Sequence, residues 1–379
     1  MTIKNHIVAL ASILSMRMLG LFMIFPIFSL YAQQLPNITP LLIGLAIGIY
    51  GLTQAILQIP FGMLSDRIGR KPIIYFGLLI FAIGSIVAAL SSSITGIIIG
   101  RALQGSGAIA STILALTADL SSEEDRTKAM ATLGVSIGMS FILALIIGPI
   151  FYNWIGISGI FWLTAALAIS GTVILYYWVP EPINCNSTIK TSFKTVLKNT
   201  QLLRLDIGIF LLHFSLTALF VVLPISLATQ VDAVWQVYIP VLSLSIVVMV
   251  PCIILAEKYN HMKLVFITAI AILALSQLGF SYLHTNFIGI VIMLFLFFTA
   301  FNILEASLPS LISKITPIDS KGTAMGVYST AQFLGAFMGG ISGGFLHQYY
   351  GIETVFIICA LLIFIWLIFA LTMKNITKR

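Results

Sequence analysis

Four ionisable side chains lie within long apolar stretches of this 379-residue chain: Arg17, Arg101, His213 and Glu305. A charge inside a membrane is costly, so such residues mark ion or substrate pathways. Glu305 stands nine residues before Lys314, which places it about 13 Å inside a helix. A carboxylate that moves between dry and wet surroundings changes its proton affinity, and histidine titrates near neutral pH.

These residue types predict a proton-coupling group. We expect Glu305 to be the principal proton carrier and His213 an accessory site, while Arg101 and Arg17 supply positive charge in the first half of the chain. Three of these residues have a structural alternative. Glu305 could make a hydrogen bond within its span, His213 could be a packing histidine, and Arg17 could join two helices.

A second set of polar side chains follows a helical spacing. Tyr50, Gln54 and Gln58 repeat every four residues, and Asn302 and Gln332 lie in later apolar stretches. Unpaired amides are unfavourable in lipid, so these side chains are expected to face a substrate cavity or another helix.

The amino-acid composition predicts which kind of secondary structure must position these residues. Hydrophobic residues make up 59% of the chain and charged residues 8%, and the mean hydropathy is +1.10. A soluble domain carries about a quarter charged residues, so this composition excludes one. Because a membrane helix needs roughly 20 apolar residues, the sequence predicts an all-α membrane protein of twelve transmembrane helices, at residues 7–31, 41–62, 73–91, 95–119, 130–152, 158–179, 205–229, 236–256, 264–283, 286–313, 322–346 and 352–373.

The basic residues predict the orientation of these helices. All 19 Lys and Arg except Arg17 and Arg101 fall at the N-terminus, in every second connection or in the C-terminal tail. By the positive-inside rule, both termini are then cytosolic. The partition also accounts for the net charge of +7 without nucleic acid. The longest connection predicts two six-helix bundles, residues 1–179 and 205–379, joined by a basic cytosolic linker, residues 180–204.

Other classes of protein lack support. A signal peptide is the alternative for the N-terminus, but the apolar run continues to Tyr31, contains Arg17 and lacks a cleavage site. The three cysteines have no CxxC spacing, and no GxxxxGK[ST] motif is present. We therefore expect no cofactor, no metal and no enzymatic activity.

The run from Gly62 to Pro72, GMLSDRIGRKP, is the sharpest motif. It places one acidic and three basic side chains in a short predicted connection. The structural reading is a charged hairpin that fixes topology. The run also resembles the G-x-L-x-D-R-x-G-R-K signature of the major facilitator superfamily, which implies two rocking six-helix bundles.

Further stretches resemble the proton-driven drug antiporters of that superfamily, in particular the YajR-type exporters. Arg101 to Ala108 is similar to their R-x-x-q-G-x-G-a element, although Tyr152 and Asn153 replace glycines of the antiporter G-P-x-x-G-G element. YajR-type relatives can carry a soluble C-terminal domain, and none is expected after Arg379. The resemblance implies helix-packing positions at Gly20, Pro26, Gly105, Gly148 and Pro149.

The resemblance also implies a conformational latch around the signature run. Asp66 is expected near the start of the eleventh span, and Arg70 is expected to bridge Asp66 to Asp119. The alternative is a static cluster. The expected latch residues are Gly62, Asp66, Arg67, Gly69, Arg70, Lys71 and Asp119. Asp206, beside Arg204, is expected in an ion pair at a helix end.

The sequence therefore predicts a monomeric secondary transporter of a bacterial-type inner membrane. Its expected partners are protons, a small apolar or cationic substrate that it exports, and the lipid bilayer. A metabolite or nutrient transporter on the same scaffold is the first alternative. A membrane-embedded enzyme, or a receptor without transport, is the second.

Overall fold

The computed structural model describes residues 3–181, 196, 198–231, 233–316 and 321–373. The regular structure of these residues is helical throughout. Most of the predicted linker, 182–195 and 197, lies outside the described residues. The chain divides into two compact units, residues 1–38 with 49–190 (unit 1) and residues 39–48 with 191–379 (unit 2).

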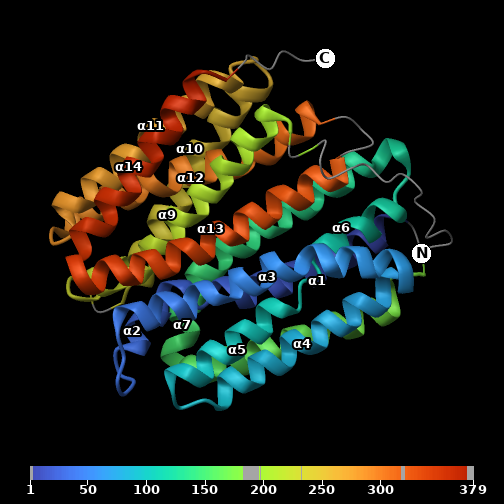
Figure 1. Cartoon of the computed structure of the whole chain (residues 1–379), viewed down its shortest axis with the longest axis horizontal. Coiled ribbons are helices and arrows are strands. Elements are labelled where there is room, and N and C mark those ends of the chain that lie inside the picture. The colour runs from blue at the N-terminus through green and yellow to red at the C-terminus, as the bar shows by residue number, and fades with distance from the viewer. Residues whose placement is uncertain (1–2, 182–195, 197, 232, 317–320, 374–379) are drawn as a thin grey trace. The chain divides into compact units, whose positions relative to one another are not determined.

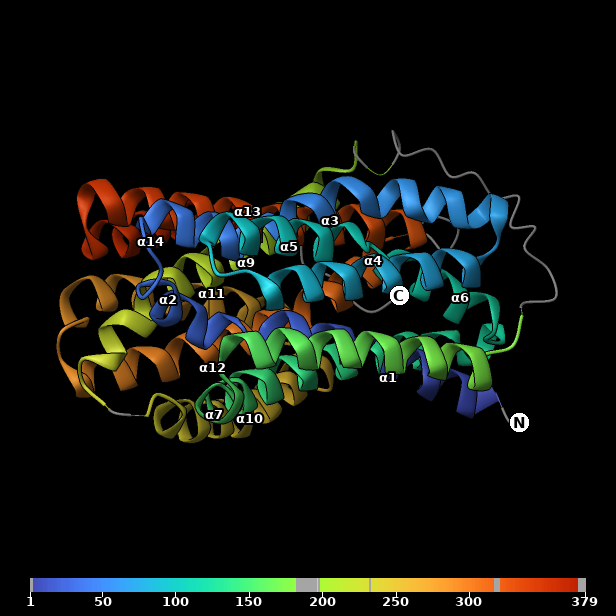
Figure 2. The same ribbon diagram turned by 90° about the horizontal axis from the view of Figure 1, so that it is seen from below.

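Unit 1 contains the helices of the first half of the chain (Figures 1 and 2). They are α1 (Ile3–Phe22), α2 (Phe25–Ala32), most of α3 (Pro40–Ile68), α4 (Arg70–Leu90), α5 (Ile94–Ser106), α6 (Ala110–Asp119) and α7 (Glu123–Trp178).

Three breaks divide these helices. The predicted stretch 7–31 is interrupted between α1 and α2, two residues before Pro26, and the stretch 95–119 is interrupted at Gly107–Ile109 between α5 and α6. Proline and glycine favour such breaks because proline lacks an N–H and glycine lacks a Cβ. Within the 56-residue α7, Gly156 has φ 64°, which only glycine adopts readily. Two predicted spans, 130–152 and 158–179, lie on either side of it.

Unit 2 contains α9 (Thr200–Ala228), α10 (Trp235–Glu257), α11 (Met262–Leu283), α12 (Phe287–Ile315), α13 (Lys321–Tyr350) and α14 (Ile352–Leu371). In the described part of the chain, ten helical segments are long and apolar enough to cross a membrane. That set counts α7 once and leaves out α13. The twelve crossings and the cytosolic termini therefore stay predictions.

A line of glycines brings α13 against α9 in unit 2. A Cβ at Gly335 would overlap the carbonyl oxygen of Phe210, and a Cβ at Gly339 would overlap that of Phe214. Because the contact positions increase together along both helices, α9 and α13 run parallel and side by side (Figure 1). Close backbone approach through small residues is the usual packing mode of membrane helices.

Small residues also hold unit 1 together. A Cβ at Gly20 would overlap the side chain of Thr164, and a Cβ at Gly148 would overlap the carbonyl oxygen of Met23. Gly105 lies against the backbone of Tyr50. Pro26 stands in the first turn of α2, and Pro149 lies inside α7. These positions lie where helices approach or bend, so substitutions there would change helix packing.

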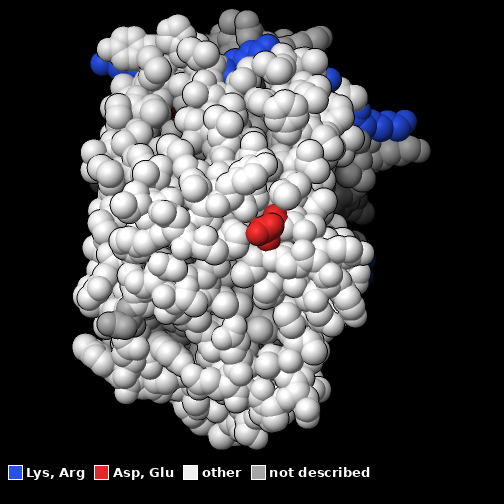
Figure 3. Space-filling model, turned by 90° about the vertical axis from the view of Figure 1, so that its left-hand side faces the viewer, with Lys and Arg blue, Asp and Glu red and all other residues white. Residues whose placement is uncertain are grey.

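Charged side chains avoid one side of the molecule. The face in Figure 3 shows one acidic group, with Lys and Arg only along its upper and right-hand edges. The short connections after α2, α4, α9, α11 and α13 contain no Lys or Arg. This distribution is the asymmetry on which the orientation prediction rests.

Substitution of the α13 glycines tests the α9–α13 seam. We expect Gly339→Ala to lower the unfolding free energy by about 1–3 kcal/mol, because the added methyl overpacks a backbone contact. The measurement is thermal unfolding of the purified protein in detergent. Gly326→Ala is the matched control, because no atom lies within 4 Å of a Cβ at that position. Equal melting temperatures for the two variants would contradict the packing argument.

Candidate functional site

A buried polar cluster joins three helices of unit 2. His213 comes from α9, Glu305 from α12 and Gln332 from α13. The Gln332 Nε2 donates to Glu305 Oε1 at 3.2 Å and lies 2.9 Å from His213 Nε2. His213 Nε2 is 3.8 Å from Glu305 Oε2. The His213 side chain is 7% exposed and that of Glu305 is 28% exposed, but the Glu305 Oε2 atom is buried.

The donor and acceptor roles in this cluster depend on the protonation of His213. When Gln332 Nε2 donates to both neighbours, His213 Nε2 must act as an acceptor and therefore carries no proton. Protonation of His213 would place two donors opposite each other and would favour a direct contact with Glu305. The ring of Phe301 lies 5.7 Å from the His213 ring and limits the space available to it. Uptake of a proton by His213 would therefore change which hydrogen bonds the cluster makes.

Unit 1 holds a second buried cluster around Arg17. Its Nη2 donates to Gln54 Oε1 at 2.5 Å, and Gln54 Nε2 donates to Gln58 Oε1 at 3.1 Å. Arg17, Gln54 and Gln58 are each at most 1% exposed. The predicted polar stripe on α3 therefore faces α1, and its Gln54 side chain orients Arg17.

Arg101 lies close to the same group. Its Nη1 donates to Gln104 Oε1 at 2.9 Å, and Gln104 Nε2 donates to Ser85 Oγ at 2.8 Å. The guanidinium carbons of Arg17 and Arg101 lie 5.7 Å and 5.1 Å from the ring centre of Tyr50. One aromatic ring therefore faces two cations, an arrangement that offsets part of their desolvation.

Asn302 belongs to neither cluster. Its Nδ2 donates to Ser245 Oγ of α10 at 3.0 Å. The structure thus brings Gln332 to Glu305 and His213, brings Tyr50, Gln54 and Gln58 to the arginines, and places Asn302 apart. Access of these five side chains to a substrate stays a prediction.

The signature run forms a compact ion cluster in unit 1. Gly69 has φ 103°, a conformation that favours glycine, and it directly precedes α4. Arg70 then forms an ion pair with Asp66, approaches Asp119 Oδ2 with its Nε at 2.9 Å, and donates to Ser65 Oγ at 2.7 Å. The Arg70 side chain is 5% exposed.

The other basic residues of this run behave differently. Lys71 Nζ donates to the carbonyl oxygen of Val179 at 2.8 Å and lies 3.6 Å from Glu181. Arg67 is exposed, and Gly62 lies beside Ser111. Lys71 therefore ties α4 to the end of α7 within unit 1.

Asp206 differs from its sequence prediction. Arg204 Nη1 donates to the carbonyl oxygen of Thr372 at 3.1 Å, and Asp206 takes part in none of the ion pairs of the described residues. Asp206 is 7% exposed. The predicted ion pair is wrong: Asp206 is buried, whereas Arg204 binds the backbone at the end of α14. Asp206 lies seven residues before His213, on the same face of the helix, and this spacing is the sequence signal that favours an inward-facing Asp206.

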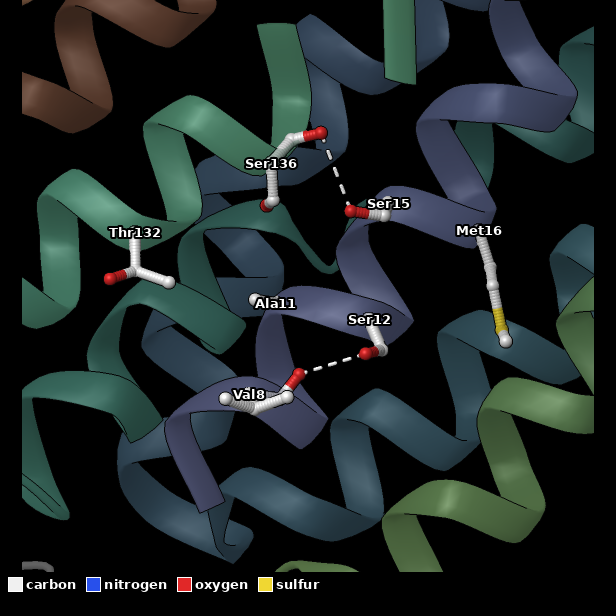
Figure 4. Close-up of a pocket in the computed structure, with 7 residues that line it drawn as sticks. All are labelled: Val8, Ala11, Ser12, Ser15, Met16, Thr132 and Ser136. Carbon is white, nitrogen blue, oxygen red and sulfur yellow. Dashed lines mark hydrogen bonds between the residues drawn. The ribbon is translucent and has the colours of Figure 1, made fainter. Parts of the chain in front are cut away.

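One pocket of about 330 Å³ lies between α1 and α7 in unit 1 (Figure 4). Its hydroxyls are bonded to backbone: Ser15 Oγ donates to Ser136 O at 3.4 Å and Ser12 Oγ donates to Val8 O at 2.9 Å. None of the predicted site residues lines it. Among the described residues, no group of three His, Cys, Asp or Glu could hold a metal ion.

Comparison with known proteins identifies the family. The sequence profile of the Major Facilitator Superfamily matches residues 10–340 and 205–378. The chain belongs to this superfamily. It is 47% identical over 374 residues to the inner membrane transport protein YajR of Escherichia coli K12, covering 97% of this chain and 82% of that protein.

Two further similarities agree. This superfamily member is 40% identical over 359 residues to an uncharacterized transporter of Buchnera aphidicola subsp. Baizongia pistaciae, covering 91% of each chain. Its fold matches the crystal structure of a bacterial homologue of the human lysosomal transporter Spinster with a TM-score of 0.79, at 14% identity over 96% of this chain and 95% of that one. The protein is thus a multi-pass membrane transporter of this superfamily, and its relatives' names point away from an enzyme.

Carboxylate substitutions test the Arg70 cluster of this superfamily member. The Asp119 side chain is 19% exposed and that of Asp66 is 57% exposed. We therefore expect Asp119→Asn to lower the unfolding free energy by about 2 kcal/mol, between the exposed and buried cases. Asp66→Asn, the matched control, should cost about 0–1 kcal/mol. Double-mutant cycles with Arg70→Gln, followed by thermal unfolding, measure the contributions of both carboxylates. Equal losses of unfolding free energy in Asp119→Asn and Asp66→Asn would contradict the argument that the less exposed carboxylate contributes more.

Proposed function

We propose that this protein is a proton-coupled secondary transporter of the bacterial inner membrane that exports small apolar or cationic compounds. The observation that carries the proposal is the cluster of Glu305, His213 and Gln332. In it, the Gln332 amide lies within hydrogen-bonding distance of both an acid and a base, which are 3.8 Å apart inside an apolar unit. A static packing role would not need two titratable groups here, because burying them is costly.

In the proposed cycle, Glu305 binds a proton from outside while Gln332 and His213 hold its carboxyl in place. Neutral Glu305 costs less to bury, so protonation favours the state in which the cavity turns inward. The proton then leaves to the cytosol, and the negative carboxylate attracts a cationic substrate. Each charge that crosses a potential of 100 mV supplies about 2.3 kcal/mol.

The first half of the chain has a complementary role in this proposal. Arg17 and Arg101 set a positive field beside Tyr50, and Tyr50, Gln54, Gln58, Asn302 and Gln332 contribute polar contacts to the substrate cavity. Residues 1–179 and 205–379 act as six-helix bundles that rock about the linker 180–204. The protein works as a monomer, with both termini in the cytosol.

The Arg70 cluster acts as the conformational latch in this proposal. Gly62, Asp66, Arg67, Gly69, Arg70, Lys71 and Asp119 together stabilise the outward-facing state. A bias of one to two kcal/mol is enough to shift a two-state equilibrium, and two ion pairs of Arg70 at about 0–1 kcal/mol each can supply it.

Transport in proteoliposomes tests the proposal. Purified protein is reconstituted with an imposed pH gradient, and uptake of the lipophilic cation tetraphenylphosphonium is followed together with proton movement. We expect gradient-driven uptake in the wild type and at least a tenfold loss in Glu305→Gln, because that side chain cannot bind and release a proton. Glu353→Gln, which neutralises a carboxylate in the first turn of α14, should retain wild-type uptake.

Two outcomes would overturn the proposal. Unchanged proton-coupled uptake in Glu305→Gln would remove Glu305 as the carrier. Proton-coupled movement of sugars, amino acids or organic acids without movement of tetraphenylphosphonium would favour a metabolite or nutrient transporter on the same scaffold.

A further inference from the structure

Arg17 of α1 is a buried cation with unused hydrogen-bond donors. The residue is 1% exposed, and its Nη2 donates to Gln54 Oε1 at 2.5 Å. Its other two nitrogens, Nε and Nη1, are buried and have no hydrogen-bond partner among the described residues. An arginine has five N–H donors and keeps its charge in proteins. A buried arginine with unused donors therefore costs free energy unless another group binds it.

A further unused donor belongs to Gln58 of α3. Gln54 Nε2 donates to Gln58 Oε1 at 3.1 Å, so only the Gln54 amide separates the Gln58 side chain from Arg17. The other amide atom of Gln58, Nε2, is buried without a partner in the described part of the chain. Ser111 Oγ donates to the backbone oxygen of Gln58 at 3.0 Å, which holds this part of α3 against α6. Arg17 and Gln58 thus offer buried N–H groups from two adjoining helices.

A second buried cation adds positive charge at this place. Arg101 of α5 is 1% exposed. Its guanidinium carbon lies 5.1 Å from the centre of the Tyr50 ring, and that of Arg17 lies 5.7 Å from the same centre. Like charges that share one buried site raise the free energy of both, so an anion at this site would stabilise both arginines.

The acidic residues of the first half of the chain are engaged elsewhere. The sequence has no Asp or Glu before Asp66 and none between Asp66 and Asp119. Both of these carboxylates form ion pairs with Arg70. The other acidic residues before position 180, 123–125, stand in the first turn of α7. Arg17 takes part in none of the ion pairs of the described residues, so its charge calls for an anion from outside the chain.

The surroundings of Arg17 favour a small anion. Its guanidinium carbon lies 5.5 Å from the ring centre of Phe81, and Phe81 and Tyr50 are at most 2% exposed. A drug-sized ligand needs a cavity of about 300 Å³ or more, and the pocket of about 330 Å³ in unit 1 is not lined by Arg17 or Gln58. A water molecule would satisfy the donors but would leave the charge uncompensated.

We propose that Arg17 and Gln58 bind a monovalent anion of the size of chloride inside unit 1. The unused N–H donors of Arg17 and the Gln58 amide are its ligands, and Arg101 adds attraction at longer range. Two buried cations and one anion leave a net positive charge in this cluster, so the positive field of the proposed function is kept. The site does not rest on the proton chemistry of Glu305.

Chloride binding tests the site without a known substrate. Purified protein in detergent is equilibrated with radioactive chloride at constant ionic strength, with gluconate as the replacing anion, and bound chloride is counted by scintillation proximity. We expect saturable binding in the wild type and loss of that binding in Arg17→Gln. Gln58→Leu should raise the Kd for chloride about tenfold, because one hydrogen bond to a charged group is lost.

Thermal unfolding in the same solutions gives a second readout. An anion that binds only the folded chain stabilises it, so the melting temperature of the wild type should be higher in chloride than in gluconate. The two melting temperatures of Arg17→Gln should be equal. Arg204→Gln is the matched control, because it removes an arginine of unit 2 that donates to the Thr372 backbone. This control should keep both the chloride binding and the difference in melting temperature.

Several outcomes would overturn the anion site. One is a wild type that binds no chloride saturably or that melts at the same temperature in chloride and gluconate. Another is an unchanged Kd in Arg17→Gln. If Arg17→Gln does not fold, an unchanged Kd in Gln58→Leu is decisive by itself. Neither readout involves Glu305 or tetraphenylphosphonium, so failure of the anion site is distinguishable from failure of the proposed function.

Discussion

The close approach of α9 and α13 is the constraint on which the site in unit 2 depends. Gly335 and Gly339 let the two backbones touch at Phe210 and Phe214, and His213 lies between those two phenylalanines in sequence. The same two helices carry His213 and Gln332, whose side chains meet at 2.9 Å. Glycine packing therefore holds together the two helices that bring Gln332 to His213, although no glycine takes part in the hydrogen bonds of the cluster described above.

The two units offset the free-energy cost of buried charged side chains in different ways. Unit 1 surrounds Arg17 with the oxygen of Gln54 and the ring faces of Tyr50 and Phe81, which hold a permanent charge in a fixed place. Unit 2 instead buries groups that can lose or gain a charge, Glu305 and His213, beside a neutral amide. In the proposed mechanism, the fixed cations of unit 1 supply a constant field and the titratable groups of unit 2 bind and release the proton.

Several site residues could be predicted from the sequence because the depth of a residue within an apolar stretch can be counted directly along the chain. Glu305, His213, Arg17 and Arg101 stand out among apolar neighbours, and the signature run identifies Arg70 and Asp119. The environment of Asp206 could not be predicted in this way. Asp206 stands close to a basic residue in sequence, which suggests an ion pair that the structure does not contain.

The amino-acid sequence by itself determined the helical membrane class, the positions of the apolar stretches and the superfamily resemblance, because hydropathy and a compact motif are local properties. The tertiary structure alone decided which polar groups meet. It paired Gln54 with Arg17 and Gln332 with Glu305, and it separated Asp206 from Arg204. The physical reason is that helix rotation and crossing depend on long-range packing of small residues, so the partner of a buried side chain lies on another helix, far away in sequence.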